Sequence, residues 1–383
     1  MIAGGLDAQF LSIFSDPRRF SGAEEAKGRA LDMIEAVRRQ VELHADRLEL
    51  ALGPDEIREA SARGRIAILM GLEGGHAIAN DLATLDLFYD LGVRYMTLTW
   101  SNTNDWADSS TDEQRHGGLT QFGREVIREM NRLGMIVDVS HASDDTFWDV
   151  VATTGAPIIA SHSSARALVD VPRNMSDEML RAVAASGGVV MVNFGGAFID
   201  PRKAGTWNML WDALLHLGPS STPLSALLDH IDHVVHVAGV DSVGLGSDFD
   251  GTLFLPDEAR DVAGFPAITA GLLERGHSAE DIRKILGENL LRAFGETEAV
   301  AAHLRMASTA QQGSLYVLSP DVSRGSLRAH LRCPGRGSPH GRGTPPDQGP
   351  GEQSTVGTLT RPAELPISGQ RLDETGQSAM KFP

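Results

Sequence analysis

The sequence predicts an α/β fold, a (β/α)8 TIM barrel that lacks its first strand, followed by a disordered tail. Short β-branched or apolar runs alternate with longer helical patterns through residues 1–305, which is typical of a parallel sheet built from βα units. That length suits such a barrel, which needs roughly 250 residues. Only seven strand-like runs can be counted, so the missing strand is expected to precede Met1.

The strands and helices follow from local patterns. Ser21 and Glu24 form a capping box that opens a helix extending to about Leu50. A second helix covers residues 119–133 and ends at Gly134. The seven expected strands are residues 9–14, 66–72, 95–99, 136–139, 158–160, 189–193 and 243–246.

The composition changes near residue 305. Residues 306–383 hold 9 of the 18 prolines and 11 of the 41 glycines, with no sustained apolar period. We therefore expect two parts, a barrel over 1–305 and a disordered tail over 306–383 that is too poor in apolar residues to form its own core.

Charge and cysteine content exclude several classes of function. The net charge of −17 repels phosphate backbones, so nucleic acid is not an expected partner. The single cysteine, Cys333, can form neither an internal disulfide nor a cysteine-based zinc cage, so a metal must be held by His, Asp and Glu. Without a run of about 18 apolar residues or a signal-peptide pattern, no membrane segment is expected and the chain is expected to be cytoplasmic.

Residues suited to metal binding follow four of the expected strands. Glu73 comes directly after residues 66–72, and His141, His162 and Asp248 each follow a later strand by two residues. Because the carboxyl ends of parallel strands converge on one face of a barrel, these side chains should meet in one cup. Two imidazoles and a carboxylate form a complete catalytic zinc set with one position open for water. The spacing therefore predicts a metal site.

Other histidines have simpler interpretations. His76 follows two glycines that disfavour the helix of a helical zinc motif, so a structural role is expected. His230, His233 and His236 fall on one expected helix, where a solvated or core-packed face is the favoured reading.

Arg173 and two tryptophans are candidates for substrate contacts. Arg173 lies just downstream of His162, on an expected loop over the same face. Its guanidinium suits a substrate carboxylate by bidentate pairing, and a surface salt bridge is the alternative. Trp100 and Trp106 could wall a pocket, and packing of the barrel explains them equally well.

Six motifs occur along the chain in a fixed order: Glu-Gly-Gly-His, Tyr-Met-Thr-Leu-Thr followed by Trp-Ala-Asp, Val-Asp-Val-Ser-His, Ser-His-Ser-Ser-Ala, Pro-Arg-Asn and Gly-Ser-Asp-Phe-Asp-Gly. In this order they resemble the membrane (renal) dipeptidase family, from residue 4 to about 304. The resemblance implies an amidohydrolase-like, metal-dependent hydrolase barrel that cleaves dipeptides with two bridged zinc ions.

The resemblance also implies roles for individual residues. Glu73 resembles the carboxylate that bridges both metals, and His141 and His162 resemble ligands of the second zinc. Asp248 resembles the acid/base aspartate, and Arg173 the residue that receives the carboxylate of the dipeptide. A homodimer is a further expectation from the resemblance.

The chain departs from the family pattern at two places. The family takes ligands of its first zinc from a His-x-Asp motif on the first strand, and this chain begins after that point. Animal relatives place a histidine that touches the scissile peptide where this chain has Trp100, so Trp100 is expected beside the substrate. We therefore expect one zinc, held by Glu73, His141 and His162, and a barrel seam with unpaired backbone groups.

The leading hypothesis is a zinc-dependent dipeptidase in which metal-activated water attacks the peptide bond and Asp248 transfers the proton. Two alternatives stay open. One is another amidohydrolase-like enzyme that acts on a cyclic amide or a lactone, and the other is a non-catalytic barrel that acts as a binding or assembly protein.

Overall fold

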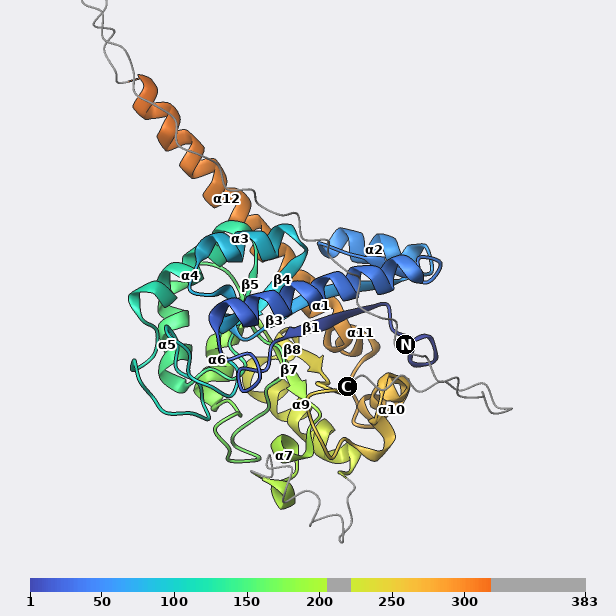
Figure 1. Ribbon diagram of the computed structural model, residues 1–383. Coiled ribbons are helices and arrows are strands. Elements are labelled where there is room, and N and C mark those ends of the chain that lie inside the picture. The colour runs from blue at the N-terminus through green and yellow to red at the C-terminus, as the bar shows by residue number, and fades with distance from the viewer. Residues whose placement is uncertain (205–221, 318–383) are drawn as a thin grey trace, which may run out of the picture. The chain divides into compact units, whose positions relative to one another are not determined.

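The protein is described by a computed structural model over residues 1–204 and 222–317. In this part of the chain, helices surround a parallel sheet (Figure 1). The strands are β1 (Ala8–Phe14), β2 (Leu48–Leu50), β3 (Ile66–Glu73), β4 (Val93–Thr97), β5 (Ile136–Asp138), β6 (Ile158–Ala160), β7 (Val189–Asn193) and β8 (Val243–Gly246).

Seven of these strands form one path in the order β1-β3-β4-β5-β6-β7-β8, and every pair along it is parallel. All seven expected strands are present, each within two residues of its predicted bounds. Among the described residues no pairing joins β8 to β1, so the barrel is open at that seam. The predicted α/β, TIM-barrel-like class is confirmed.

β2 corrects the predicted long helix. The helix expected to reach about Leu50 ends at Leu43, and β2 then pairs in parallel with the start of β3, where Leu48 lies opposite Ile66. The two leucines of β2 pack against a small apolar cluster that includes Val41. Tertiary pairing therefore overrides the helical pattern over these residues.

The start of the same helix also differs by one residue. It begins after Gly22, whose backbone N–H donates to Glu25 Oε2 at 3.4 Å, so Ser21 and Glu24 do not form the predicted capping box. The helix of residues 119–133 begins at Gln121 and ends, as predicted, at Gly134, which has a φ of 89°.

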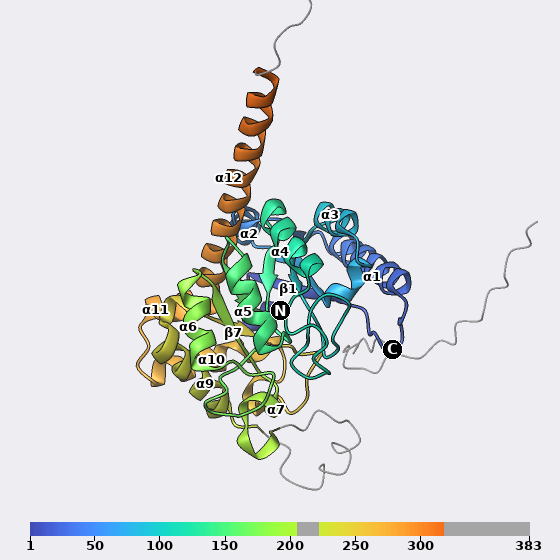
Figure 2. The same cartoon turned by 90° about the vertical axis from the view of Figure 1, so that its left-hand side faces the viewer.

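Most of the described helices lie between strands along the chain, and the last three follow β8; Figure 2 shows them around the sheet. None of those described is both long and apolar enough to cross a bilayer. Their bounds are α1 (Ala23–Leu43), α2 (Pro54–Ala62), α3 (Leu82–Asp90), α4 (Gln121–Leu133), α5 (Asp144–Thr153), α6 (Asp177–Ala185), α7 (Gly196–Ile199), α9 (Leu224–Ala238), α10 (Phe265–Glu274), α11 (Ala279–Arg283) and α12 (Asn289–Val317).

The sheet separates two apolar clusters, because successive side chains of a strand point to opposite faces. On β3, Met70 and Leu72 belong to the large cluster formed with the helices. Leu69 belongs to a smaller cluster with Tyr95 and Ile159 from neighbouring strands, which fills the inside of the barrel. The residues two and four positions after Leu69 therefore continue along the inner face.

The boundary predicted at residue 305 falls inside α12, which continues to Val317. The helix begins within the folded body, where Phe294 is fully buried in the inner cluster. The rest of the predicted tail, residues 318–383, lies outside the described residues, and so does Cys333.

Candidate metal centre

Glu73 reaches the mouth of the barrel because of its position on β3. It lies four residues after Leu69 and so on the same inner face, at the carboxyl end of the strand. Its Oε2 accepts a hydrogen bond of 2.8 Å from the Ser12 hydroxyl of the adjacent β1. This contact leaves Oε1 as the oxygen that faces the two histidines.

The structure brings the predicted ligands Glu73, His141 and His162 together. Glu73 Oε1 lies 3.4 Å from His141 Nε2 and 3.6 Å from His162 Nε2, and the two Nε2 atoms lie 2.9 Å apart. Tetrahedral bonds of about 2.0 to 2.1 Å to zinc would place neighbouring ligand atoms about 3.4 Å apart. The three atoms therefore match a single tetrahedral site, with the nitrogen pair slightly closer than zinc would hold it.

The electrostatic state of both imidazoles suits metal binding. Burial lowers the pKa of His141 and His162 well below the usual value. The Glu73 carboxylate opposes the shift of His162, and the nearby Arg173 cation lowers the pKa of both. Neutral imidazole, which prevails in that case, is the form that coordinates metals. Among the described residues, these two histidines and Glu73 are the one group whose ligand atoms all lie within 4.8 Å of one another.

Asp248 lies beside this group on the loop after β8. Burial first, and the Glu73 charge after it, raise the pKa of its carboxyl to about 7, while Arg173 and a hydrogen bond from Asn193 oppose the shift. The Asn193 amide donates to Asp248 Oδ2 at 3.2 Å. A carboxyl that titrates near neutral pH can both accept and donate a proton, as an acid/base group must.

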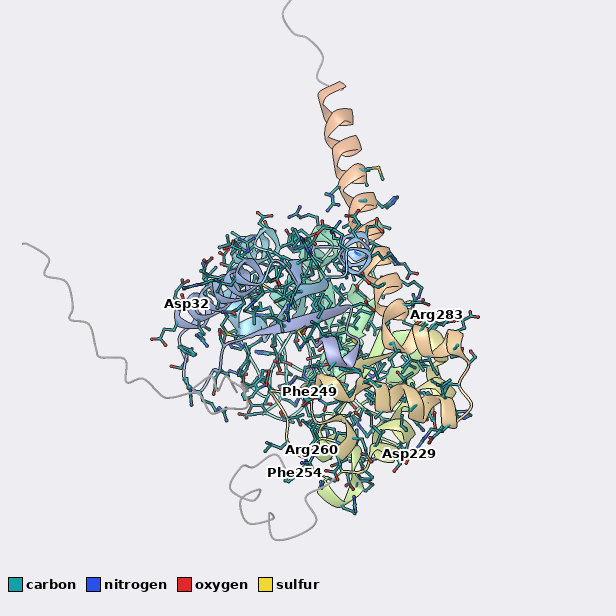
Figure 3. The ribbon with its side chains drawn as sticks, turned by 90° about the vertical axis from the view of Figure 1, so that its right-hand side faces the viewer. Asp32, Asp229, Phe249, Phe254, Arg260 and Arg283 are labelled. Atoms are coloured by element: carbon teal, nitrogen blue, oxygen red, sulfur yellow. The ribbon has the colours of Figure 1, made fainter. Side chains whose placement is uncertain are left out.

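The loop that carries Asp248 is anchored by aromatic packing. Phe249, labelled with other residues of this region in Figure 3, meets the rings of Phe194 and Phe265 with centroids 5.7 and 6.2 Å apart. The backbone of Asp248 has a φ of 54°, a region that non-glycine residues seldom adopt. Such strain is often found at functional sites.

Arg173 is buried over the same site, so the alternative of a surface salt bridge is wrong. Its guanidinium donates to the backbone oxygen of His162 at 3.2 Å and to Ser163 Oγ at 3.5 Å, and it lies over the ring of Phe198. Burial lowers the pKa of Arg173 to about 10, while the Asp248 and Glu73 carboxylates oppose that shift. Neither of these hydrogen bonds goes to a carboxylate.

The two tryptophans lie in different environments. Trp100 is half-buried beside the site, with its ring centroid 5.0 Å from Phe14 and 6.3 Å from the imidazole of His141. Trp106 is fully buried in the large cluster and packs edge-on against Phe122. Of the pair, only Trp100 is placed to wall a pocket.

The other histidines do not join the metal group. His76 Nε2 donates a hydrogen bond of 2.8 Å to the Ser15 carbonyl, which supports its structural interpretation. His230 is buried in α9 and accepts from the Ala165 backbone, and His233 pairs with Asp177.

A cavity of about 740 Å³ opens onto the site. Glu73, His162 and Asp248 line it together with apolar side chains from inside the barrel, such as Met191, and with further charged side chains, such as Arg283. It lies between the unpaired edges of β1 and β8. Three of the predicted site residues therefore line the same cavity.

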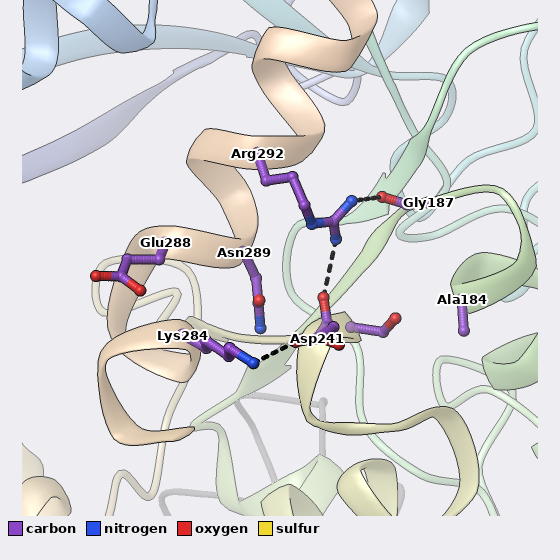
Figure 4. Close-up of a pocket in the computed structure, with 8 residues that line it drawn as sticks. Ala184, Gly187, Asp241, Lys284, Glu288, Asn289 and Arg292 are labelled. Atoms are coloured by element: carbon purple, nitrogen blue, oxygen red, sulfur yellow. Dashed lines mark hydrogen bonds and ion pairs between the residues drawn. The ribbon is translucent and has the colours of Figure 1, made fainter. Parts of the chain in front are cut away.

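A second cavity, of about 510 Å³, lies at the opposite ends of the strands (Figure 4). Its charged side chains are already paired: Lys284 Nζ with Asp241 at 2.9 Å, and Arg292 with the carbonyls of Gly187 and Asp241 at 2.8 and 2.9 Å. Residues at the amino-terminal face of such a barrel commonly serve stability. We assign this cavity no role in the chemistry.

Sequence reasoning missed several polar residues at the site, Ser12 among them. Asn193 ends β7, so the search for polar residues at strand ends could have found it. Asp138 and Ser161 lie within the motifs around His141 and His162, and their hydrogen bonds to each other gave no sequence signal.

Comparisons with known proteins agree with this geometry. The family model for membrane dipeptidase (peptidase family M19) matches residues 1–308. The dipeptidase tcpJ of Claviceps purpurea is 35% identical over 342 residues, which are 87% of this chain and 75% of that protein.

Solved structures are similar as well. The probable dipeptidase PvdM from Pseudomonas aeruginosa is 29% identical, with a TM-score of 0.71 over 78% of this chain and 88% of its own. A metallopeptidase from Rhodobacter sphaeroides, solved with a phosphinate mimic of the dipeptide L-Ala-D-Ala, is 28% identical, with a TM-score of 0.69 over 78% and 88%.

Proposed function

Because this chain belongs to the membrane dipeptidase family of metallopeptidases, we propose that it hydrolyses dipeptides with one zinc ion held by Glu73, His141 and His162. The observation that carries the proposal is the convergence of these three ligand atoms within 4.8 Å beside a buried arginine and a carboxyl with a raised pKa. Bound zinc would activate water and polarise the peptide carbonyl.

The protein's own side chains supply the remaining parts. Asp248 accepts a proton from the attacking water and returns it to the leaving amine, which its pKa of about 7 permits. Arg173 receives the free carboxylate of the substrate, since a buried guanidinium with only neutral hydrogen-bond acceptors gains a charged partner on binding. Trp100 walls the substrate on the side of His141.

One zinc rather than two follows from the second oxygen of Glu73. The Ser12 hydroxyl donates to that oxygen, and no other carboxylate or imidazole joins the group in the described part of the chain. Short substrates follow from the capture of a terminal carboxylate, because a longer peptide has none at that distance.

The first experiment measures zinc per chain after dialysis together with the hydrolysis of a simple dipeptide, for the wild type and Asp248→Asn. We expect one zinc in both proteins and a loss of kcat/KM of roughly 10²- to 10⁴-fold in the variant. Two tightly bound zinc ions would refute the one-metal site. Unchanged turnover in Asp248→Asn would refute its acid/base role.

A further inference from the structure

Asp138 is a buried carboxylate that the proposed chemistry does not use. It ends β5 on the inner face, and both its oxygens are fully engaged. Oδ2 accepts from Thr97 Oγ1 at 2.5 Å and Ser161 Oγ at 2.6 Å, and Oδ1 accepts from the backbone N–H of Ser161 at 2.8 Å and of Ser140 at 3.0 Å. Burial raises the pKa of Asp138, and the hydrogen bonds from these four donors oppose that shift. Four donors suit an ionised carboxylate, which only accepts.

The Ser161 hydroxyl connects this carboxylate to a zinc-binding imidazole. Ser161 Oγ lies 2.7 Å from His162 Nδ1 as well as 2.6 Å from Asp138 Oδ2. The hydroxyl has one proton, and Asp138 takes it because a carboxylate cannot donate. Nδ1 of His162 must therefore carry the proton of its own hydrogen bond to Ser161.

This proton count determines the tautomer of His162. With the proton on Nδ1, Nε2 is left with a lone pair, and that is the atom 3.6 Å from Glu73 Oε1. His141 has no such support: its Nδ1 is buried without a hydrogen-bond partner in the part of the chain that is described. The two histidines are therefore not equivalent before a metal binds.

We propose that Asp138 and Ser161 are positioning residues that hold the proton of His162 on Nδ1 and so present Nε2 to the zinc ion. The inference rests on the proposed function and deepens it. Carboxylates often orient a metal-binding histidine by direct contact, and here a serine hydroxyl stands between the two.

Two variants interrupt this contact in different ways. Ser161→Ala removes the acceptor for Nδ1–H. In Asp138→Asn, the amide oxygen faces the backbone donors, so the amide NH₂ faces the two hydroxyls. The Ser161 hydroxyl then has no acceptor at residue 138 and donates to His162 Nδ1 instead. The imidazole proton of His162 consequently lies on Nε2. Thr97→Val is the matched control, since it deletes a hydrogen bond to the same oxygen of Asp138 without touching His162.

The first readout is zinc affinity, measured by competition with a chelator. We expect Ser161→Ala and Asp138→Asn to bind zinc 10- to 100-fold more weakly than the wild type. The zinc affinity of Thr97→Val should stay within about threefold of the wild-type affinity. Ser161→Thr keeps the hydroxyl and should retain most of the affinity. An equal loss in Thr97→Val and Ser161→Ala would reduce the contact to a structural one and overturn the proposal.

The second readout is the tautomer of His162 in the metal-free protein, from the imidazole ¹⁵N shifts of histidine-labelled protein, with the signal assigned by its absence in His162→Gln. We expect Nδ1–H in the wild type and Nε2–H in Asp138→Asn. Finding Nε2–H in the wild type overturns the proposal even if the enzyme is active. A wild type that binds no zinc would instead refute the proposed function, and the tautomer would still decide this inference. If Asp138→Asn does not fold, Ser161→Ala and Thr97→Val suffice.

Discussion

Burial disfavours the charged form of the Asp248 carboxyl. This carboxyl lies close to the Glu73 charge, and the backbone of Asp248 holds a positive φ. Gly251 makes room for it, because a Cβ there would meet Asp248 Oδ1 at 2.2 Å. The loop therefore holds the Asp248 carboxyl in an environment that disfavours its ionised form, which is common for reactive groups.

The raised pKa of Asp248 predicts how the stability of the fold depends on pH. The pKa of Asp248 is about 7 in the folded protein against an ordinary 3.8, so the folded state keeps a proton that the unfolded chain releases, and stability falls as pH rises through this window. Asp248→Asn avoids that loss. In thermal unfolding of metal-free protein, the Tm of the variant relative to the wild type should increase from pH 4.5 to 7.5.

The control for this experiment is Asp32→Asn, which changes an exposed carboxyl on α1 that is not among the charges acting on Asp248 and should show little pH-dependent difference. A Tm difference for Asp248→Asn that is the same at every pH would contradict the assignment.

Arg173 carries a prediction about substrate binding. Arg173→Lys keeps the charge but loses the planar fork, so KM for a free dipeptide should rise roughly 10- to 100-fold while kcat changes less. For the corresponding dipeptide amide, which has no terminal carboxylate, the wild type and the variant should be similar. Arg166→Lys, at a bidentate pair with Asp144, is the control and should change neither KM. Equal effects on dipeptide and amide would rule out capture of the carboxylate.

At the scale of elements, β3 packs beside β4 because Gly71 has no side chain. A Cβ on Gly71 would lie 2.0 Å from the ring of Tyr95, which fills the inner face from the neighbouring β4. The layer above holds Glu73 and Thr97 at the carboxyl ends of the same two strands. Packing at Gly71 therefore supports the layer that carries the metal group.

The same substitution should have opposite effects in two elements. Gly71→Ala forces Tyr95 to move and should destabilise the fold by about 1 to 3 kcal/mol or more. Gly28→Ala, on the exposed face of α1 with no atom within 4 Å, should stabilise it by about 0.5 to 1 kcal/mol. Chemical denaturation of both variants checks this, and a Gly71→Ala protein as stable as the wild type would mean that Tyr95 does not pack as described.

At the scale of the whole molecule, the metal and the fold should be coupled. The three ligands come from the ends of β3, β5 and β6, so only the folded chain brings them together. An ion that binds the folded state alone stabilises it by about 4 kcal/mol at 1,000 times its Kd.

Removal of zinc should therefore lower the Tm, and zinc should restore it at one ion per chain. Glu73→Gln should largely abolish the zinc-dependent shift, whereas Glu24→Gln, on the exposed start of α1, should retain it. If a chelator removes the zinc and the Tm of the wild type stays unchanged, the ion does not bridge these strands.

Much of this architecture could be predicted because it depends on short-range patterns. All seven main strands and the end of α4 at Gly134 follow from apolar runs and a left-handed glycine. β2 could not be predicted, since three residues reveal no period and its leucines are stabilised by partners from other elements, such as Val41 on α1 and Ile66 on β3. The extension of α12 past residue 305 was missed because proline and glycine are abundant only further along the chain.

By itself, the sequence determined the ligand types and their spacing, because strand ends in a parallel barrel meet on one face whatever the loops between them do. Only the tertiary structure decided how these groups interact. Burial moved the pKa of Asp248 towards neutrality, the Ser12 hydroxyl took one oxygen of Glu73, and the contact from Asp138 through Ser161 determined the tautomer of His162. Each depends on atoms brought within about 3 Å by packing, a scale on which spacing along the chain carries no information.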